Sequence, residues 1–187
     1  MKTKNKSLII VIAVIVILVF WTAGKYNGMV KTSEDVKTNQ SNIETNLQRR
    51  ADLIPNLVST VKGYAAHESE VIDSIADARS KMAGAKTTEE ALKADGELTQ
   101  ALSKLLVVVE QYPDLKANEN FKMLQTELEG TENRIAIARR DYNESAKKYN
   151  TQIKRFPTNI FAKMFGFEQV PYFEAAPGSE KAPEVKF

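Results

Sequence analysis

An uncharged stretch near the N-terminus, from Ser7 to Gly24, constrains the fold of this chain more than any other feature of its sequence. Residues 8–20 within it are apolar without interruption. A helix rises about 1.5 Å per residue, so the stretch spans about 27 Å, close to the roughly 30 Å hydrocarbon core of a bilayer. Trp21 and Tyr26 follow where interfacial aromatic residues are expected. The sequence therefore predicts a single-pass transmembrane anchor over residues 1–24.

A cleaved signal peptide is the alternative for this segment, because a basic start and an apolar core precede the small residues 22–24. The bulky Trp21 and the length of the apolar stretch favour a retained anchor. The chain contains no cysteine, which excludes a lipoprotein, disulfides and thiolate metal sites.

The charges around the anchor predict its orientation. Three lysines in residues 1–6 precede the apolar stretch, and the density of basic residues is lower in residues 25–37 on its other side. This difference favours a cytoplasmic N-terminus and an extracytoplasmic domain. Removing the first three lysines from the formal net charge of +2 leaves a remainder near −1, which offers no electrostatic surface for nucleic acid.

After the anchor, apolar residues recur at alternating steps of three and four. The four seams run over Tyr26–Arg50, Ile54–Met82, Leu98–Tyr112 and Phe121–Tyr149. A period near 3.5 residues predicts long helices packed with a left-handed twist. The expected fold is all-α: an antiparallel up-and-down four-helix bundle over residues 25–155, preceded by the single N-terminal transmembrane helix.

Three breaks are expected between the bundle helices. Residues 52–55 end in Pro55, residues 84–88 precede a helix start at Thr87 or Thr88, and Pro113 breaks the third connection. The seam keeps its phase past Pro55, so one helix through that proline is an alternative. A first hairpin folded near residue 53 would place Gln40 level with Glu68. The two side chains would then form a buried polar layer, or Glu68 would lie at the edge of the seam in contact with water.

The catalytic and metal-binding patterns that were considered are incomplete. His67-Glu68 begins like a zinc-protease motif, but the chain has only one histidine. The sequence therefore predicts no catalytic residue, no cofactor and no metal. The pairs Arg49-Arg50 and Arg139-Arg140 are interpreted mainly as solvated ion-pairing residues.

The Tyr-Asn pairs and several longer motifs together resemble the LemA family. The matching stretches include LQRRADLIPNLV at 47–58, VKGYAAHE at 61–68, YPDLKA at 112–117, ENRIAIARRDYN at 132–143 and FPTN at 156–159. The family-motif positions expected to have structural roles are Tyr26, Asn27, Arg49, Arg50, Pro55, Asn56, Tyr64, Tyr112, Pro113, Arg139, Tyr142, Asn143, Tyr149, Asn150, Phe156 and Pro157. The resemblance implies a membrane-anchored antiparallel four-helix bundle with no established activity.

Residues 156–173 are rich in aromatic side chains, unlike the bundle. This segment is expected either at the membrane end of the anchor or folded back as a cap on the bundle. Residues 174–187 are rich in Ala, Pro, Gly, Glu and Lys and are predicted to be disordered.

These features favour a non-enzymatic scaffold or accessory protein of the bacterial envelope. Its expected partners are the membrane and other membrane or envelope proteins. A homo-oligomer is a further alternative. The alternative is a small-ligand binder or enzyme that uses a polar cleft between helices. A buried carboxylate–arginine cluster would favour that alternative, and a dry apolar interior would favour the scaffold.

Overall fold

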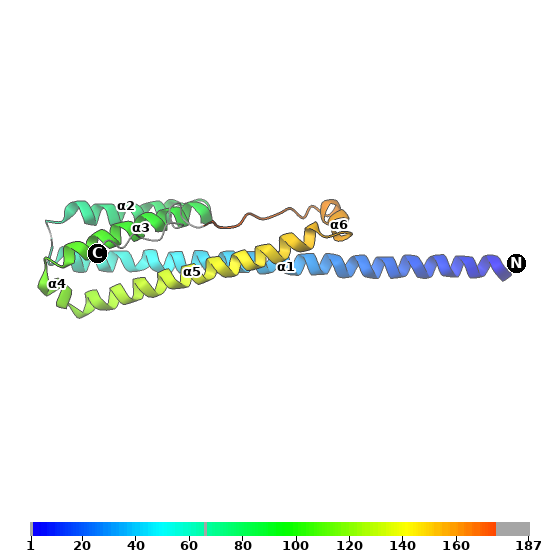
Figure 1. Cartoon of the computed structure of the whole chain (residues 1–187), viewed down its shortest axis with the longest axis horizontal. Helices are drawn as coiled ribbons and strands as arrows, with labels where there is room; N and C mark the ends of the chain where they lie inside the picture. The colour runs from blue at the N-terminus through cyan, green and yellow to red at the C-terminus, as the bar shows by residue number, and fades with distance from the viewer. Residues whose placement is uncertain (1, 66, 175–187) are drawn as a thin grey trace, which may run out of the picture. The chain divides into compact units, whose positions relative to one another are not determined.

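The computed structural model describes residues 2–65 and 67–174, with side chains from Ile9 onward. Its helices are α1 (Lys2–Lys62), α2 (Ser69–Gly84), α3 (Thr88–Val109), α4 (Pro113–Ala117), α5 (Glu119–Lys154) and α6 (Thr158–Met164) (Figure 1). The described residues contain no strand, which confirms the all-α prediction. Of the tail predicted to be disordered, residues 175–187 lie outside the described residues.

The chain divides into two compact units. The anchor unit comprises Met1–Asn39 and Tyr142–Tyr172, and the bundle unit comprises Gln40–Asp141 and Phe173–Phe187. Helices α1 and α5 each contribute residues to both units. In the bundle unit the last part of α1, then α2, α3 and the first part of α5 run alternately in opposite directions, as an up-and-down four-helix bundle.

The predicted break at residues 52–55 is wrong, because α1 continues through Pro55 to Lys62. A proline within a helix lacks the N–H that would bond the carbonyl four residues earlier, here that of Ala51. Arg79 of α2 supplies the missing donor, since its Nε lies 3.0 Å from the Ala51 oxygen. A contact from the neighbouring helix thus satisfies the carbonyl that Pro55 leaves unbonded.

The first hairpin turns at residues 63–68 rather than near residue 53, so the proposed pairing of Gln40 with Glu68 is also wrong. Glu68 precedes α2 and accepts a hydrogen bond from the Tyr112 hydroxyl at 2.7 Å. Gln40 instead donates to the Thr88 hydroxyl at 2.9 Å. Moving the turn by about three helical turns changes which residues lie level with each other across the bundle.

The other two breaks are confirmed. Thr87 is the N-cap of α3, and its hydroxyl accepts from the Glu90 N–H at 3.1 Å. The Glu90 side chain accepts in return from the Lys86 N–H at 2.8 Å. Pro113 begins α4, where a missing N–H is tolerated.

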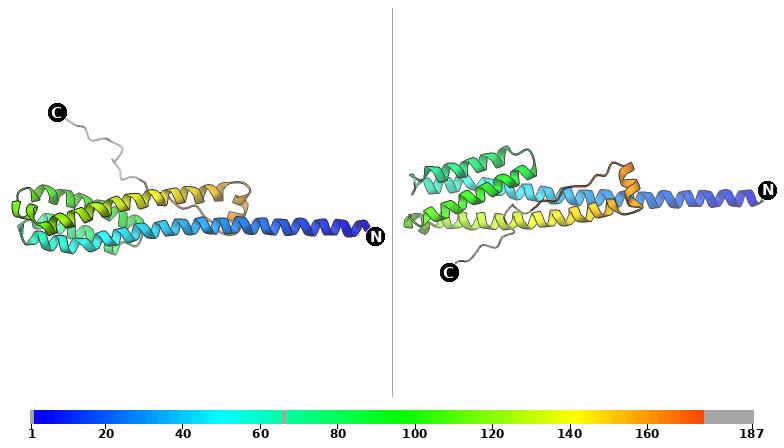
Figure 2. Two further views of the ribbon diagram at one scale, coloured as in Figure 1. Left: turned by 90° about the horizontal axis from the view of Figure 1, so that it is seen from below. Right: turned by 45° about the horizontal axis from the view of Figure 1, so that its top comes forward.

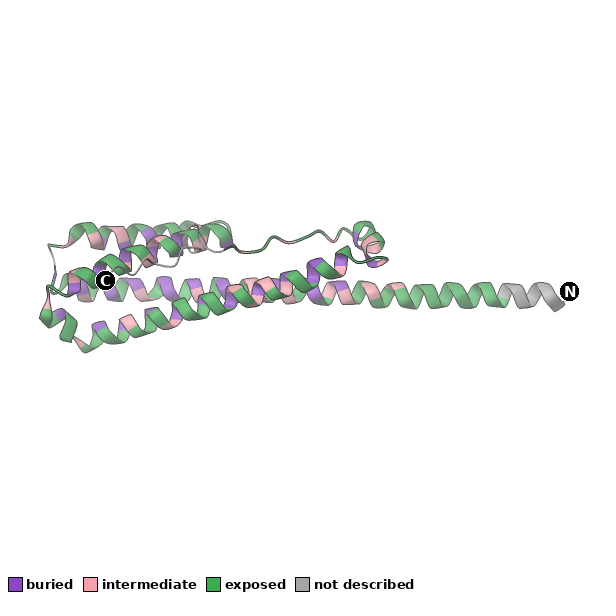
Figure 3. Ribbon diagram, viewed as in Figure 1, coloured by how far each residue is buried: buried purple, intermediate pink, exposed green. Residues whose placement is uncertain are grey.

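Most of the predicted seam positions form the core of the structure, although the seam residues Tyr26 and Tyr64 are exposed. Their buried positions appear as a stripe along the helices (Figure 3). In the bundle unit the buried seam residues include Ile43, Leu47, Ile54, Leu57, Ile75, Leu98, Leu105, Leu128 and Ile135. In the anchor unit Met29, Val36, Tyr142 and Tyr149 continue the pattern.

The apolar start of α1 has the opposite character. Every residue from Ile9 to Phe20 is exposed in the structure. Within the part of the chain whose side chains are described, α1 is the one helix long and apolar enough to cross a membrane. A fully exposed apolar helix of this length is stable in lipid and unfavourable in water.

Candidate functional site

The most unusual feature of the bundle interior is a buried arginine. Arg50 occupies the last position of the first seam, and its side chain is only 1% exposed. Its Nη1 donates to the Asp95 carboxylate of α3 at 2.8 Å, and its Nη2 donates to the Thr99 hydroxyl at 3.0 Å. Asp95 and Thr99 lie one helical turn apart, so both reach the same guanidinium.

A second carboxylate reaches the cluster from α5. Glu132 accepts from Arg50 Nη2 at 3.4 Å, but its own side chain is half exposed. Three helices of the bundle unit therefore meet at one cation. The interpretation of Arg50 as solvated is wrong, although its role in an ion pair is confirmed.

The electrostatics of this cluster are dominated by burial. Burial raises the pKa of the Asp95 carboxyl above its ordinary value, and the nearby Arg50 guanidinium opposes that shift. Arg50 Nε is buried and has no hydrogen-bond partner among the described residues. The cluster therefore retains one buried donor that the described residues leave unbonded.

A cavity of about 90 Å³ lies beside this cluster. Leucines and Phe121 form the apolar part of its wall, and its polar groups come from Arg50, Thr99, Ser103, Gln125, Glu129 and Glu132. Sites for drug-sized ligands occupy about 300–1,000 Å³. The cavity is therefore of a size for water molecules or a small ion.

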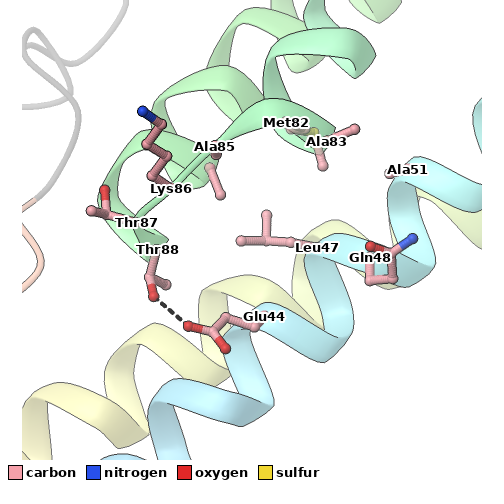
Figure 4. A pocket seen from close by; sticks show the side chains of 11 residues that line it. Glu44, Leu47, Gln48, Ala51, Met82, Ala83, Ala85, Lys86, Thr87 and Thr88 are labelled. Carbon is pink, nitrogen blue, oxygen red and sulfur yellow. Dashed lines mark hydrogen bonds between the residues drawn. The ribbon is translucent and has the colours of Figure 1, made fainter.

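A larger pocket, of about 340 Å³, lies where α1 meets the connection between α2 and α3 (Figure 4). Leu47, Ala51 and Met82 form an apolar side, and Gln48 and Lys86 lie at polar positions. The Glu44 carboxylate in this wall is already engaged, since the Thr88 hydroxyl donates to it at 2.6 Å. The pocket thus combines a mainly small-residue lining with few free polar groups.

The Tyr-Asn motifs of α5 form a second cluster, within the anchor unit. The Asn150 side chain bonds both backbone groups of Val170: its Nδ2 donates to the carbonyl at 2.8 Å, and its Oδ1 accepts from the N–H at 3.0 Å. The Tyr142 hydroxyl donates to the Pro171 carbonyl at 3.0 Å. Burial raises the pKa of the hydroxyls of Tyr142 and Tyr149. These side chains hold the extended segment after α6 against α5.

The aromatic segment lies against the end of the apolar run. Phe161 of α6 contacts Trp21 edge-on at 5.7 Å between ring centroids, and Phe165 contacts Tyr26 at 5.0 Å. Gly166, which follows the C-cap residue Phe165 of α6, has a positive φ of 75°, and the Phe167 N–H donates to the Ala162 carbonyl at 2.9 Å. This C-terminal cap turns the chain so that Phe167 also reaches Tyr26, at 5.8 Å.

The remaining motif residues lie mostly on the surface. Arg49 pairs with Glu127 at 3.0 Å, and the Tyr64 hydroxyl accepts from Asn118 at 3.0 Å. Arg139 is half-buried and donates to the Glu174 carbonyl at 2.6 Å. Exposed or partly exposed positions also include Asn27, Pro55, Asn56, Tyr112, Pro113, Asn143, Phe156 and Pro157. His67 is exposed in the turn between α1 and α2, rather than within a helix.

The sequence could have indicated the acidic partner of Arg50. Asp95 lies three residues before Leu98 and therefore extends the third seam in phase. Both ends of the buried ion pair thus occupy seam positions, where an unpaired charge would be costly. Thr99 and Glu132 lie beside seams and carry no comparable signal.

Comparisons with known proteins identify the relatives of this chain. The model of the LemA family matches residues 39–187. Magnetosome protein MamQ 2 of Paramagnetospirillum magneticum is 32% identical over 182 residues, which cover 83% of this chain and 67% of that protein. Magnetosome protein MamQ of Magnetospirillum gryphiswaldense is 30% identical over 201 residues, covering 92% and 74%. Protein LemA of Metamycoplasma hominis is 28% identical over 163 residues, covering 86% and 74%. Because the family match spans most of the chain and these relatives align along most of its length, this protein belongs to the LemA family.

Proposed function

We propose that this protein is a non-enzymatic scaffold or accessory to other membrane proteins of the bacterial envelope. The observation that carries the proposal is the contrast between the exposed apolar run of α1 and a bundle whose seam positions are mostly occupied by its own buried apolar side chains, the Arg50–Asp95 cluster apart. A helix of this kind fixes the protein to a bilayer, and the bundle then presents its outer faces to neighbours. The relatives named as magnetosome proteins support this class, because that name denotes a structure rather than a reaction.

The outer faces of the bundle unit offer apolar contact positions. Val107 of α3 is 70% exposed, and Met123 of α5 is 59% exposed. Covering an exposed apolar side chain of this size with a partner protein is favourable, because it removes apolar surface from water. Asp77 of α2 provides an exposed polar position for comparison.

Site-specific crosslinking in native membranes tests the scaffold proposal. A photoreactive residue placed at Val107 or Met123 is expected to capture the same discrete membrane protein, or a second copy of this chain. The same residue placed at Asp77 is the control and is expected to capture neither. Adducts that are diffuse and identical at all three positions would contradict the proposal.

The proposed topology places the N-terminus in the cytoplasm and the bundle outside it. The basic residues before the apolar run support this orientation. The chain has no cysteine, so a single Val107→Cys variant provides one labelling site. A membrane-impermeant maleimide is expected to label that variant in intact cells. Labelling only after the membrane is opened would contradict the topology.

A buried ion-binding role is the second candidate function, and the Arg50 cluster is the observation that favours it. Arg50 and the hydroxyls of Thr99 and Ser103 are the groups of the adjoining cavity that could bind a small anion, and the carboxylates of Glu129 and Glu132 in the same wall oppose it. A thermal-shift series with formate, acetate and phosphate tests this role in the purified protein. An ion that raises the melting temperature of the wild type, but not that of Arg50→Met/Asp95→Leu, would favour binding. No shift with any of the three would remove this candidate.

A further inference from the structure

The end of the apolar run in α1 sets the level at which a membrane surface would meet the anchor unit. Lys25 is the first charged residue after the uncharged stretch that begins at Ser7. Its Nζ lies 5.4 Å from the centroid of the Trp21 ring. A lysine beside a tryptophan at the end of an apolar helix is typical of the bilayer interface.

Helix α6 is held at this same level by ring contacts. Phe161 meets Trp21, and Phe165 meets Tyr26, so the two turns of α6 lie beside the last turns of the apolar run. Its other apolar side chains have no such cover, since Phe156 is 81% exposed and both Ile160 and Met164 are also exposed. Ile160 and Met164 lie four residues apart within α6 and therefore share one side of that helix, whereas Phe156 precedes the helix.

A basic groove of about 640 Å³ lies on the same unit. Four cations line it: Lys25 of α1, Lys147 and Lys148 of α5, and Arg155, which follows α5. Glu144 is the one carboxylate in its lining, and Thr151 and Thr158 add hydroxyls. The lining therefore carries an excess of three positive charges.

The four cations of this groove are distinguished by lining one site, because exposed lysines elsewhere, such as Lys93, Lys104 and Lys122, also form no ion pair among the described residues. Arg49, Lys81 and Lys116 each pair with a glutamate at 3.0 Å or less. Among residues 9–65 and 67–174, no ion pair includes any of the four cations of the groove. Their charge is therefore available to an external anion.

The anchor unit also keeps α1 and α5 close where this groove forms. The Gln152 amide nitrogen lies 3.0 Å from where a Cβ on Gly28 would be, and the Gln152 oxygen accepts from the Thr32 hydroxyl at 2.9 Å. Gly28 thus leaves space for a side chain of α5 to approach the backbone of α1. This contact fixes the cations of the two helices relative to one another.

We propose that the groove lined by Lys25, Lys147, Lys148 and Arg155 binds the phosphate headgroup of an anionic phospholipid, while Phe156, Ile160 and Met164 enter the surrounding interface. The chemistry that recognises the ligand is a cluster of unpaired cations with two hydroxyls, suited to a phosphodiester. A lipid rather than a soluble phosphate compound is favoured, because the groove adjoins the end of the transmembrane run and carries apolar residues on the same unit. The inference rests on the membrane attachment by α1 and does not require the scaffold role.

Native mass spectrometry of the full-length protein in detergent tests the proposal. Phosphatidylglycerol and phosphatidylcholine with the same acyl chains are added in equal amounts, and the lipid retained on the protein is identified. Each cation near a membrane surface favours anionic lipid by about 1 kcal/mol, equivalent to about fivefold. The wild type is therefore expected to retain phosphatidylglycerol over phosphatidylcholine by about tenfold or more.

The triple variant Lys147→Gln/Lys148→Gln/Arg155→Gln is expected to reduce that preference at least about fivefold. The matched control, Lys93→Gln/Lys104→Gln/Lys122→Gln, removes three exposed lysines of the bundle unit and should keep the wild-type preference. The charge-conserving variant Lys147→Arg/Lys148→Arg should keep it as well. Equal loss in the groove variant and the matched control would overturn the site, because net charge alone would then explain the binding.

Two further arms separate the possible failures. A large excess of inorganic phosphate is expected to leave the retained phosphatidylglycerol in place, and its displacement by phosphate would overturn the assignment to a lipid. Carbonate extraction of membranes reports the anchor independently of the groove. Full retention in carbonate without preference for anionic lipid would overturn the lipid site alone, whereas release by carbonate would also remove the membrane attachment on which it rests.

Discussion

The two units of this protein use charge in opposite ways. In the bundle unit, Arg50 is buried against Asp95, and surface cations such as Arg49 and Lys81 are paired with carboxylates. In the anchor unit, apolar side chains from Ile9 to Phe20 are exposed, and the cations of the basic groove lack such pairs among the described residues. The bundle unit buries an ion pair in its interior, while the anchor unit leaves exposed apolar and basic surfaces of a kind that suits a lipid bilayer.

This difference indicates which parts of the molecule depend on their surroundings. A buried ion pair is sensitive to losing one partner, whatever the solvent outside. An exposed apolar helix depends instead on the medium, because the same surface that is unfavourable in water is favourable in lipid. Substitutions in the two units should therefore change different measurements.

The largest expected effect comes from removing the anchor. Deletion of residues 1–24 should move the protein from the membrane fraction to the soluble fraction, because it removes the apolar run. Fractionation and immunoblotting measure this change. Intact-mass analysis of membrane-extracted wild type should find residues 1–24 still attached. A mature protein that begins near Lys25 would instead support a cleaved signal peptide.

The next effect concerns the core of the bundle unit. Ile135→Asp should lower the free energy of unfolding by about 3–5 kcal/mol, because it places an unpaired charge in a buried seam position. Ile137→Asp is the matched control, since Ile135 is 3% exposed and Ile137 is 42% exposed. Thermal melting in detergent, followed by circular dichroism, compares the two. Equal destabilisation by both substitutions would contradict the seam assignment.

Breaking the buried ion pair should have a comparable but pH-dependent effect. Arg50→Met should cost about 3–5 kcal/mol at neutral pH, because it leaves the Asp95 carboxylate buried without its cation. Burial already raises the pKa of Asp95, and loss of Arg50 should raise it further. When the pKa of a carboxyl is higher in the folded protein than its unfolded value of about 3.9, the free energy of unfolding falls as the pH rises from that unfolded value through the folded pKa. The cost of Arg50→Met should therefore shrink as pH falls toward that unfolded value.

The double variant Arg50→Met/Asp95→Leu sharpens this result. It removes both charges and should recover most of the lost stability at neutral pH, because apolar residues can replace a buried ion pair. Denaturant titration of the single and double variants at two pH values measures the effect. A double variant as unstable as the single one would mean that the cluster contributes more than charge pairing.

A smaller and more local effect is expected in the anchor unit. Asn150→Ala removes both hydrogen bonds to Val170 and should cost about 1–3 kcal/mol locally. Hydrogen exchange should show lost protection at the Val170 amide, with little change in the bundle unit. The exposed Asn56 of α1 provides the control substitution, Asn56→Ala. Unchanged protection at Val170 would show that the bonds to Asn150 do not hold this segment.

The smallest effect tests how α1 continues through Pro55. Arg79→Ala should cost about 1 kcal/mol, because the Ala51 carbonyl loses its donor. In a Pro55→Ala background the new N–H can bond that carbonyl, so the same Arg79 substitution should cost less. A double-mutant cycle from denaturant titrations should give a coupling energy of about 0.5–1 kcal/mol. Additive effects would indicate that Arg79 acts independently of the proline.

Sequence reasoning located the core well because burial follows a simple period. Seam residues such as Leu47, Leu98 and Leu128 are buried as predicted, since a step of three and four residues returns to the same side of a helix. Periodicity does not decide between the two expected positions of the aromatic segment, whose ring contacts lie with Trp21 and Tyr26 at the end of the apolar run. The fold class therefore followed from local pattern alone.

The turn between α1 and α2 was the part that local pattern predicted wrongly. Proline is a strong break signal, but its cost falls when another group bonds the carbonyl that it leaves free. Arg79, well separated from Pro55 in sequence, supplies that group. The break predicted from Pro55 alone is therefore absent, because a contact from another helix compensates for the hydrogen bond that the proline cannot make.

The sequence by itself determined the long apolar helix at the N-terminus, the helical class, most of the seam positions and the family, because each depends on the order of residue types along the chain. Only the tertiary structure decided that Arg50 is buried against Asp95, that Asn150 binds Val170, and that four cations from α1, α5 and the turn after it line one groove. These arrangements depend on which helix faces which and at what level. Periodicity gives the buried side of each helix, but the partner on that side is set by where the turns fall.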